Sequence, residues 1–265
     1  MPAVSQAEKA EAFRALHAGK PFVIPNPWDA GSARVLAALG FEALASTSSG
    51  FAFTLGRRDG GTSLEEAVEH AAVLAGATPL PLSVDLENGY GREPESAAHA
   101  VQRIAEAGAV GGSIEDWEAD EGIYELELAV ERVTAAVEAA RRLPFPFMLT
   151  ARAENHIRGN PDLGDTIARL HAFEEAGADV LYAPGLRDSD EVRAVCQAVS
   201  RPVNVLARPG LTMAELEAAG AQRVSVGGAL AWTAVDAFAS AARAIRERGD
   251  FSGLRQAPPL DQWFA

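Results

Sequence analysis

The sequence predicts an α/β fold, a TIM-type (β/α)8 barrel, from three observations. The length of 265 residues suits a single barrel of this type, which typically takes ~250 residues. Short β-rich apolar runs alternate with longer runs of helical period. Several helices close on Gly just before the next apolar run. Repeated strand–helix units form a parallel sheet with helices outside it, and eight units favour closure. An open doubly wound sheet is the alternative.

The strands are predicted from runs that are apolar, rich in β-forming residues and bounded by turn-forming residues. They cover residues 22–28, 43–48, 82–87, 110–115, 147–154, 180–185, 203–207 and 223–228. The count of eight depends on short runs such as 43–48, so the open sheet stays under consideration.

The helices are predicted between these strands, from runs with apolar residues at helical spacing. They lie near 30–39, 64–76, 95–107, 125–142, 164–176, 188–199, 212–219 and 229–247. Four end in the segments AALGFEAL, AEAGAVGG, EEAGADVL and EAAGAQRV, where Gly can supply a left-handed cap. Without a linker or composition shift, we expect one barrel domain over 1–265, with a C-terminal helical extension from about 229 to 265.

Composition and charge exclude several classes of partner. The formal charge of −14 disfavours nucleic acid and anionic membranes. No apolar run reaches the ~18 residues of a membrane span, and the first residues carry no apolar signal segment. The only cysteine, Cys196, excludes an internal disulfide and a multi-cysteine zinc site. We therefore expect a cytoplasmic protein without nucleic-acid or membrane partners.

Three acids are expected at the carboxyl ends of two strands. In SVDLENGYG, Asp85 and Glu87 lie two residues apart and share a face, and the next strand ends with Glu115. Barrel active sites form at this edge. Three neighbouring carboxylates repel one another unless a cation compensates, and oxygen ligands favour Mg²⁺ or Mn²⁺. Helix capping or solvation in loops is the alternative.

Arg152 is the candidate for binding an acidic substrate. It ends the fifth predicted strand, in FMLTARAEN, and a guanidinium can hold a carboxylate in a bidentate fork. A structural ion pair with Glu154 or Glu115 is an equal alternative.

Three further segments carry candidate binding groups. The run STSSGFAF (46–53) offers hydroxyls and backbone N–H groups for an anion, or is simply a turn. The run SVGG (225–228) could bind a phosphate, or form a tight βα turn. Within RPVNVLARPG (201–210), Asn204 and Arg208 are candidates for substrate discrimination, with a structural role as the alternative.

The segments NPWDAGSARVLAALGFEALASTSSGFA, DLENGYG, SIED and TARAE occur in this order. Together they resemble the isocitrate lyase/phosphoenolpyruvate mutase superfamily, from about residue 20 to residue 230. The resemblance implies an α/β barrel whose final helix is commonly exchanged between subunits, and therefore a homodimer or homotetramer. It also implies that Mg²⁺ takes part and that a small 2-oxo or 2-hydroxy acid reacts through an enolate-like intermediate.

Roles for individual residues follow from the matched motifs. Asp85 would approach the metal most directly, and Glu87 and Glu115 would hold it, in part through water. Arg152 matches the carboxylate-binding arginine. Ser49, Gly50 and Phe51 match the segment that binds the substrate's carboxylate and 2-oxo group. Asp59 matches an acid on a loop that closes on the substrate.

The chain also departs from the superfamily pattern. The segment EDWEADEGIY lacks the Lys and Cys of the mobile loop of the isocitrate and methylisocitrate lyases, and Cys196 lies in a predicted helix. The glutamate that follows the sixth strand of those lyases is replaced by LYAPG. Cleavage that depends on the loop cysteine is therefore disfavoured, whereas decarboxylation needs no base to start.

The prediction is a Mg²⁺-dependent lyase that breaks a C–C bond of a small 2-oxo or 2-hydroxy di- or tricarboxylic acid. The reaction would resemble that of oxaloacetate decarboxylase or of methylisocitrate and isocitrate lyases. Aldol-type cleavage would need another base, for which Tyr182 and His156 are candidates. The alternatives are a phosphonopyruvate-type P–C mutase or hydrolase, a non-catalytic 2-oxo acid-binding barrel, and a sugar-phosphate barrel that uses SVGG.

Overall fold

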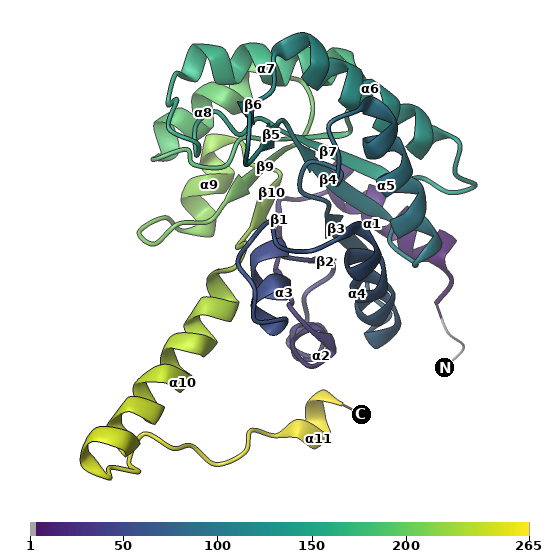
Figure 1. Ribbon diagram of the computed structural model, residues 1–265. Helices are drawn as coiled ribbons and strands as arrows, with labels where there is room; N and C mark the ends of the chain where they lie inside the picture. Colours follow the sequence, from purple (N-terminus) through teal and green to yellow (C-terminus); the bar gives the residue numbers. More distant parts are fainter. Residues whose placement is uncertain (1–3, 265) are drawn as a thin grey trace.

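The computed structural model describes residues 4–264. Its centre is one eight-stranded sheet with the order β1-β10-β9-β8-β7-β4-β3-β2 (Figure 1), and each recorded pair in it is parallel. The strands are β1 (Phe22–Ile24), β2 (Leu44–Ala45), β3 (Leu82–Asp85), β4 (Gly111–Glu115), β7 (Met148–Arg152), β8 (Val180–Tyr182), β9 (Val203–Leu206) and β10 (Arg223–Ser225). Each lies within one of the predicted strand ranges.

Contacts between the segments that follow β1 and β2 bring the two edges of the sheet together. The Ala45 N–H donates to the Pro25 carbonyl at 3.0 Å, and the Asn26 amide donates to the Ser46 carbonyl at 2.9 Å. The sheet is therefore a nearly closed barrel. The predicted TIM-type (β/α)8 fold is confirmed, and the open doubly wound sheet is wrong because its two edges would lie apart.

The eight predicted helices are present. They are α2 (Ala30–Ala38), α4 (Leu64–Ala77), α5 (Pro94–Glu106), α6 (Leu126–Arg141), α7 (Leu163–Glu175), α8 (Ser189–Ala198), α9 (Met213–Ala219) and α10 (Ala229–Arg248). The glycines that follow four of the predicted helices, Gly40, Gly108, Gly177 and Gly220, have φ values of 88°, 101°, 97° and 103°. These angles lie in the region that glycine adopts without a Cβ penalty, so the expected caps are confirmed.

The structure adds elements that the sequence did not predict. They are α1 (Gln6–Ala18), α3 (Ser48–Thr54), the hairpin β5 (Trp117–Glu118) and β6 (Gly122–Ile123), and α11 (Leu260–Trp263). The helix α1 mixes small alanines with charged residues, which weakens its apolar period. The run 46–53, for which a turn was the alternative to an anion-binding segment, starts the helix α3 instead of a simple turn, because the N-cap Thr47 side chain accepts a hydrogen bond from the Gly50 N–H.

The barrel interior is apolar at its base and polar above it. Phe13 and His17 of α1 close the base, where the His17 ring meets Phe22 edge-on at 5.2 Å. Above this layer the inward-facing positions carry polar side chains, where barrels of this type usually hold Val, Ile or Leu. These are Ser83, Ser113, Thr150, Asn204 and Arg223. Small polar side chains in the wall leave room for a deep cavity.

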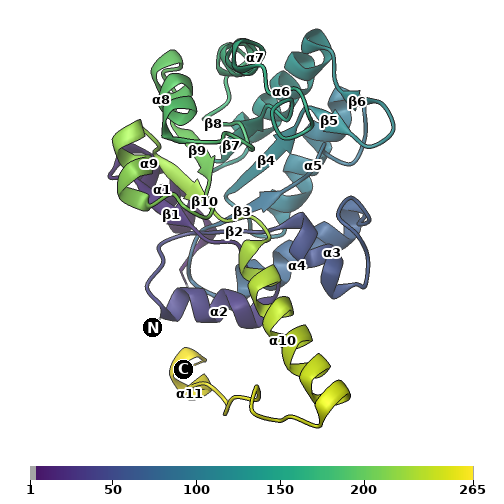
Figure 2. The same cartoon turned by 90° about the vertical axis from the view of Figure 1, so that its left-hand side faces the viewer.

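The helix α10 leaves the barrel and projects from it (Figures 1 and 2). Only Ala231 of α10 is buried, whereas Phe238 is 74% exposed. The chain then returns to α2, where the ring of Phe264 lies under the Arg34 guanidinium at 5.8 Å. Residues 1–3 and 265, the ends of the predicted domain, lie outside the described part. No helix within residues 4–264 is long and apolar enough to span a membrane.

Candidate active site

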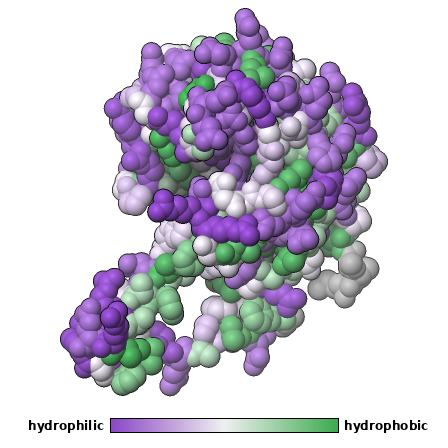
Figure 3. All heavy atoms as spheres, viewed as in Figure 1, coloured by the Kyte–Doolittle hydropathy of each residue, from purple (hydrophilic) through white to green (hydrophobic). Residues whose placement is uncertain are grey.

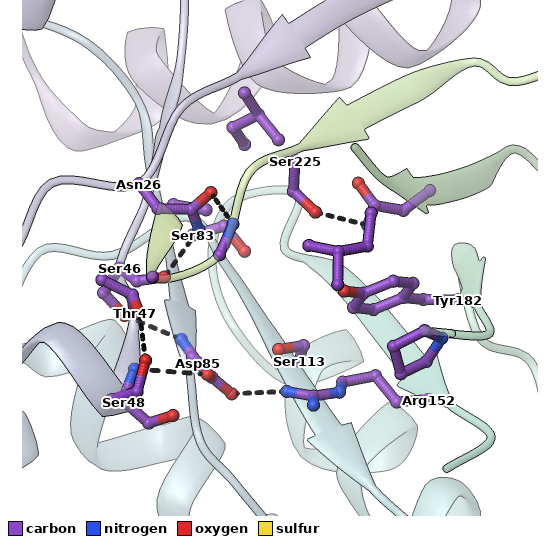
Figure 4. Close-up of a pocket in the computed structure, with 18 of the residues that line it drawn as sticks. Asn26, Ser46, Thr47, Ser48, Ser83, Asp85, Ser113, Arg152, Tyr182 and Ser225 are labelled. Carbon is purple, nitrogen blue, oxygen red and sulfur yellow. Dashed lines mark hydrogen bonds and ion pairs between the residues drawn. The ribbon is translucent and has the colours of Figure 1, made fainter. Parts of the chain in front are cut away.

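A cavity of about 220 Å³ opens at the carboxyl ends of the strands. It is smaller than the ~300–1,000 Å³ of sites for drug-sized ligands, which suits a small acid. Figure 4 shows hydroxyl side chains on one side and Arg152 with Tyr182 on the other. The charged residues that line it are Asp59, Asp85, Arg152 and Arg223. The site therefore lies at the edge of the barrel where the sequence placed it.

The Arg152 guanidinium holds three carboxylates at the side of this cavity. Its Nη1 lies 2.8 Å from Asp85 Oδ1, and its Nη2 lies 2.8 Å from Glu115 Oε2 and from Glu154 Oε1. Burial by itself would lower the pKa of Arg152, but Glu154, Glu115 and Asp85 raise it well above its ordinary value. Arg152 thus stays charged, and both ion-pair partners considered in the sequence, Glu154 and Glu115, are present.

Asp85 has further hydrogen bonds that fix its carboxylate. Oδ1 also accepts from the Glu87 N–H at 3.3 Å, and Oδ2 accepts from the Ser48 N–H at 3.3 Å. The backbone N–H of Asp85 donates to Ser46 Oγ at 2.8 Å. Asp85 therefore connects β3, the first turn of α3 and Arg152.

Glu87 is a partly buried acid that turns away from Arg152. Its Oε1 accepts from the Thr62 hydroxyl at 3.2 Å, and its backbone has a φ of 49°. Burial, followed by the charges of Asp85 and Asp59, raises the pKa of Glu87 to about 7. No basic side chain within residues 4–264 forms an ion pair with Glu87, and the charge of Arg152 only partly opposes the rise in its pKa.

The predicted metal ligands do not converge. Within residues 4–264, no group of three His, Cys, Asp or Glu side chains is placed to hold one ion. Arg152 draws Asp85 and Glu115 to itself, Glu87 reaches the loop before α4, and Glu115 does not line the cavity. Direct coordination by all three is not preformed in this conformation.

The chemistry of these side chains nevertheless fits a divalent cation. Asp85 and Glu87 present only oxygen donors, which suits a hard ion. Burial raises the pKa of Glu115 well above its usual range despite the opposing charge of Arg152, and the charges of Glu154 and Asp85 act in the same direction as burial. The oxygen donors available to a divalent cation at this edge are therefore the carboxylates of Asp85 and Glu87.

The segment around α3 supplies one of the three predicted substrate-binding residues directly. Ser49 lines the cavity. Gly50 is buried, and a Cβ there would lie 2.7 Å from Thr47 Cγ2, so this position serves close packing. Phe51 stacks on His70 at 3.9 Å and does not line the cavity. Instead, the neighbouring hydroxyls Ser46, Thr47 and Ser48 do so.

The other predicted residues occupy different positions in the site. Asp59 lines the cavity from the loop between α3 and α4. Asn204 also lines it, but its amide donates to Ser225 Oγ at 2.9 Å and accepts from Arg223 Nε at 2.8 Å. His156 faces Glu191, with Nε2 3.3 Å from Oε2, and does not line the cavity.

Tyr182 is the phenol nearest the charged groups. The Arg152 guanidinium lies over its ring, 5.4 Å from the centroid. Burial raises the pKa of Tyr182 to about 12, so the phenol is protonated at neutral pH. It can donate a hydrogen bond to a ligand and is poorly suited to act as a base.

Arg223 was not singled out in the sequence, although it lies within a predicted strand. The signal that could have identified it is its spacing: Arg223 and Ser225 share a face of β10, so the positions that point into the barrel carry a charge and a hydroxyl.

Comparisons with known proteins agree with this fold. The family model described as phosphoenolpyruvate phosphomutase matches residues 13–246. A 2-methylisocitrate lyase from Halalkalibacterium halodurans is 29% identical over 205 residues, covering 75% of this chain and 67% of that protein. An oxaloacetate decarboxylase from Rhodopseudomonas palustris is 29% identical over 267 residues, covering 95% of this chain and 90% of that protein.

Two solved structures extend the comparison. A Burkholderia cenocepacia protein, described only provisionally as a lyase/mutase, has a TM-score of 0.94 and 54% identity, covering 98% of this chain and 96% of that one. A 2,3-dimethylmalate lyase, described as a member of the PEP mutase/isocitrate lyase superfamily, has a TM-score of 0.85 and 25% identity. The match covers 99% of this chain and 94% of that chain.

Proposed function

Because the chain belongs to the phosphoenolpyruvate phosphomutase family of the PEP mutase/isocitrate lyase superfamily, we propose that it is a Mg²⁺- or Mn²⁺-dependent lyase. Its substrate is a small 2-oxo or 2-hydroxy di- or tricarboxylic acid, and a C–C bond breaks through an enolate intermediate. Relatives named 2-methylisocitrate lyase and oxaloacetate decarboxylase support this reaction class.

The observation that supports the proposal most is the arrangement of Asp85, Arg152 and Glu87. Arg152 and Asp85 form an ion pair in the cavity lining, and Glu87, whose N–H donates to Asp85, is a partly buried acid that forms no ion pair within the described chain. An anionic ligand can bind to the guanidinium of Arg152, and a cation can bind to the carboxylates of Asp85 and Glu87. Both features are required for acid substrates that react with metal assistance.

Roles follow from these positions. Arg152 binds the substrate's carboxylate, and Ser48 and Ser49 face the same space with hydroxyls. When bound at Asp85 and Glu87, the divalent cation supplies positive charge for the substrate oxygen on which negative charge develops as the bond breaks. Asp59, on an exposed loop that reaches Glu87, closes over the bound acid.

The identity of the groups around the cavity favours a reaction that needs no strong base. Tyr182 is protonated, His156 is turned toward Glu191, and Cys196 lies in α8, outside the cavity lining. Loss of CO₂ starts by breaking the C–C bond without proton abstraction. Aldol-type cleavage requires a base, and Asp59 is the carboxylate of the cavity lining that is not assigned to the cation.

The test is an assay of purified protein with oxaloacetate and with 2-methylisocitrate, with and without EDTA, following pyruvate release. We expect the protein to turn over substrate, EDTA to abolish this activity and added Mg²⁺ to restore it. We also expect Asp85→Asn to reduce the turnover at least roughly a hundredfold. Glu131→Gln makes the same kind of change on an exposed residue of α6 and serves as the matched control. Turnover that survives both EDTA and Asp85→Asn would contradict the metal mechanism.

A second candidate is a P–C bond mutase or hydrolase that acts on phosphonopyruvate. The description of the matching family model supports it. A ³¹P NMR time course with phosphonopyruvate distinguishes the two. Conversion to phosphoenolpyruvate or to inorganic phosphate would establish P–C chemistry, and an unchanged phosphonate signal would leave the C–C lyase.

A further inference from the structure

Arg223 is a buried cation that neutral groups surround. The residue is 4% exposed. Nε donates to Asn204 Oδ1 at 2.8 Å and Nη2 donates to Thr150 Oγ1 at 2.9 Å. Nη1 lies 3.2 Å from His17 Nε2. No carboxylate of residues 4–264 forms an ion pair with it, in contrast to Arg152, which has three.

The His17 ring is itself neutral and cannot offset this charge. Its Nδ1 lies 2.8 Å from the Phe13 carbonyl, which only accepts, so Nδ1 carries the hydrogen. Nε2 is then free to accept from Arg223 Nη1. Burial, followed by the charge of Arg223, lowers the pKa of His17 to about 3. Burial also lowers the pKa of Arg223 to about 10, which still leaves it charged at neutral pH.

The strand register connects Arg223 to the mouth of the cavity. Arg152 pairs with Tyr182, Tyr182 pairs with Asn204, and Asn204 pairs with Arg223. All four side chains line the cavity. A guanidinium thus stands at each end of one row of paired residues, with a phenol and an amide between them.

Space for a ligand exists because the other side of the barrel carries small side chains. Ala45, Ser83 and Ser113 line the cavity from β2, β3 and β4. The guanidinium of Arg223 has five N–H groups, and three of them account for its contacts with Asn204, Thr150 and His17. The other two have no recorded hydrogen bond within residues 4–264, and Arg223 lines the cavity. A buried charge without a counter-ion is unfavourable, and an anionic ligand would relieve that cost.

We propose that Arg223 binds a second carboxylate of the substrate, so that the cavity selects acids with one carboxylate at Arg152 and another at Arg223. The inference rests on the proposed function for the position of the first carboxylate. It adds the residue that selects for the second carboxylate, because a monocarboxylic 2-oxo acid would leave Arg223 without its anion.

The carboxylate at Arg223 is retained in the product. Its loss as neutral CO₂ would remove the charge that the guanidinium binds, so the interaction would weaken as the bond breaks and would oppose the reaction. A decarboxylation in this site therefore uses an acid with a further carboxylate that is lost, whereas an aldol-type cleavage needs only the two. Oxaloacetate, whose second carboxylate is the leaving group, is expected to react more slowly than a longer acid.

The experiment measures binding of ligand pairs matched in chain length, by calorimetry in the presence of Mg²⁺. The pairs are 2-oxoglutarate with 2-oxovalerate, and malate with 2-hydroxybutyrate; each differs by one carboxylate. We expect wild-type protein to bind each diacid at least roughly tenfold more tightly. Arg223→Gln should lose this preference and keep its affinity for the monoacids, whereas Arg152→Gln should weaken both members of each pair.

Either of two results would overturn the inference: a wild-type protein without diacid preference, or a folded Arg223→Gln variant that keeps the preference. If Arg223→Gln does not fold, the wild-type comparison and Arg223→Lys, which keeps the charge, decide. A diacid preference that depends on Arg223 in a protein without C–C cleavage would uphold this inference and contradict the proposed function. Cleavage of a C–C bond without a diacid preference would uphold the proposed function and contradict this inference.

Discussion

Arg152 and Asp85 form an ion pair, Nη1 to Oδ1 at 2.8 Å, at the edge of the cavity (Figure 4). Arg152 holds Glu115 and Glu154 at the same time, so one guanidinium compensates three carboxylates. The group proposed to bind the substrate and the group proposed to bind the cation therefore occupy each other in the ligand-free arrangement. When the acid and the cation bind, the ion pair would separate: Arg152 would bind the acid and Asp85 would bind the cation.

The Arg152 network is expected to stabilise the fold as well as the ligand. Arg152→Gln leaves Glu115 and Glu154, both almost fully buried, with only the half-buried Arg158 as a shared cation. Removing one partner of a buried ion pair costs about 3–5 kcal/mol, and we expect a loss of this order in the free energy of unfolding, measured in urea. Arg152→Lys keeps the charge but not the fork, so it should lose less stability while kcat/KM still falls. Equal stability of the two variants and wild type would contradict this account.

Mg²⁺ is expected to stabilise the protein through Asp85 and Glu87. A ligand at a hundred times its Kd adds about 2.7 kcal/mol, which corresponds to a rise in Tm of roughly 5 °C or more. Glu87→Gln removes one donor and should reduce the rise, whereas Glu131→Gln should keep it. Thermal unfolding in Mg²⁺ and in EDTA measures the effect, and an equal response of both variants would exclude Glu87 from the cation site.

His17 is expected to make the protein sensitive to acid. Its pKa of about 3 in the folded state lies below the ordinary value of ~6.5, so the unfolded chain binds more protons between these values. The stability that neutral His17 contributes is present above pH ~6.5 and is lost as pH falls toward 3. From one such group the loss at pH 5 is about 2 kcal/mol.

The variant His17→Gln tests this dependence, because an amide can still donate to Phe13 and accept from Arg223 without titrating. Urea unfolding at pH 7 and pH 5 should show a smaller decrease in stability for the variant than for wild type. Parallel decreases would show that other groups cause the acid sensitivity.

The projecting helix α10 is expected to mediate assembly. Figure 3 shows hydrophobic residues along it, and Phe238 and Trp232 are 74% and 42% exposed, which is unfavourable in water. The predicted homodimer or homotetramer would cover them. Light scattering should give a multiple of 27.8 kDa, and Phe238→Glu should shift the mass toward one chain. A monomeric wild-type mass would contradict the prediction.

The repeating pattern of the sequence was sufficient for the fold. Strand formation and helix capping depend mainly on local sequence, as in the strand runs 82–87 and 147–154 and at the capping residue Gly108. The barrel and its order of elements could therefore be predicted. The position of Asp85 and Arg152 at strand ends also followed, because strand periodicity and the parallel arrangement place them at one edge.

Only the tertiary structure decided which charged groups meet. Arg152 satisfies Asp85, Glu115 and Glu154 from three elements, and this competition separates carboxylates that spacing alone suggested would converge on a metal. The burial of Arg223 among neutral groups likewise depends on barrel closure and on His17 from α1, a helix without a clear apolar period. Electrostatic energies depend on distance and burial across the whole barrel, and neither quantity is encoded in the spacing of residues along one strand.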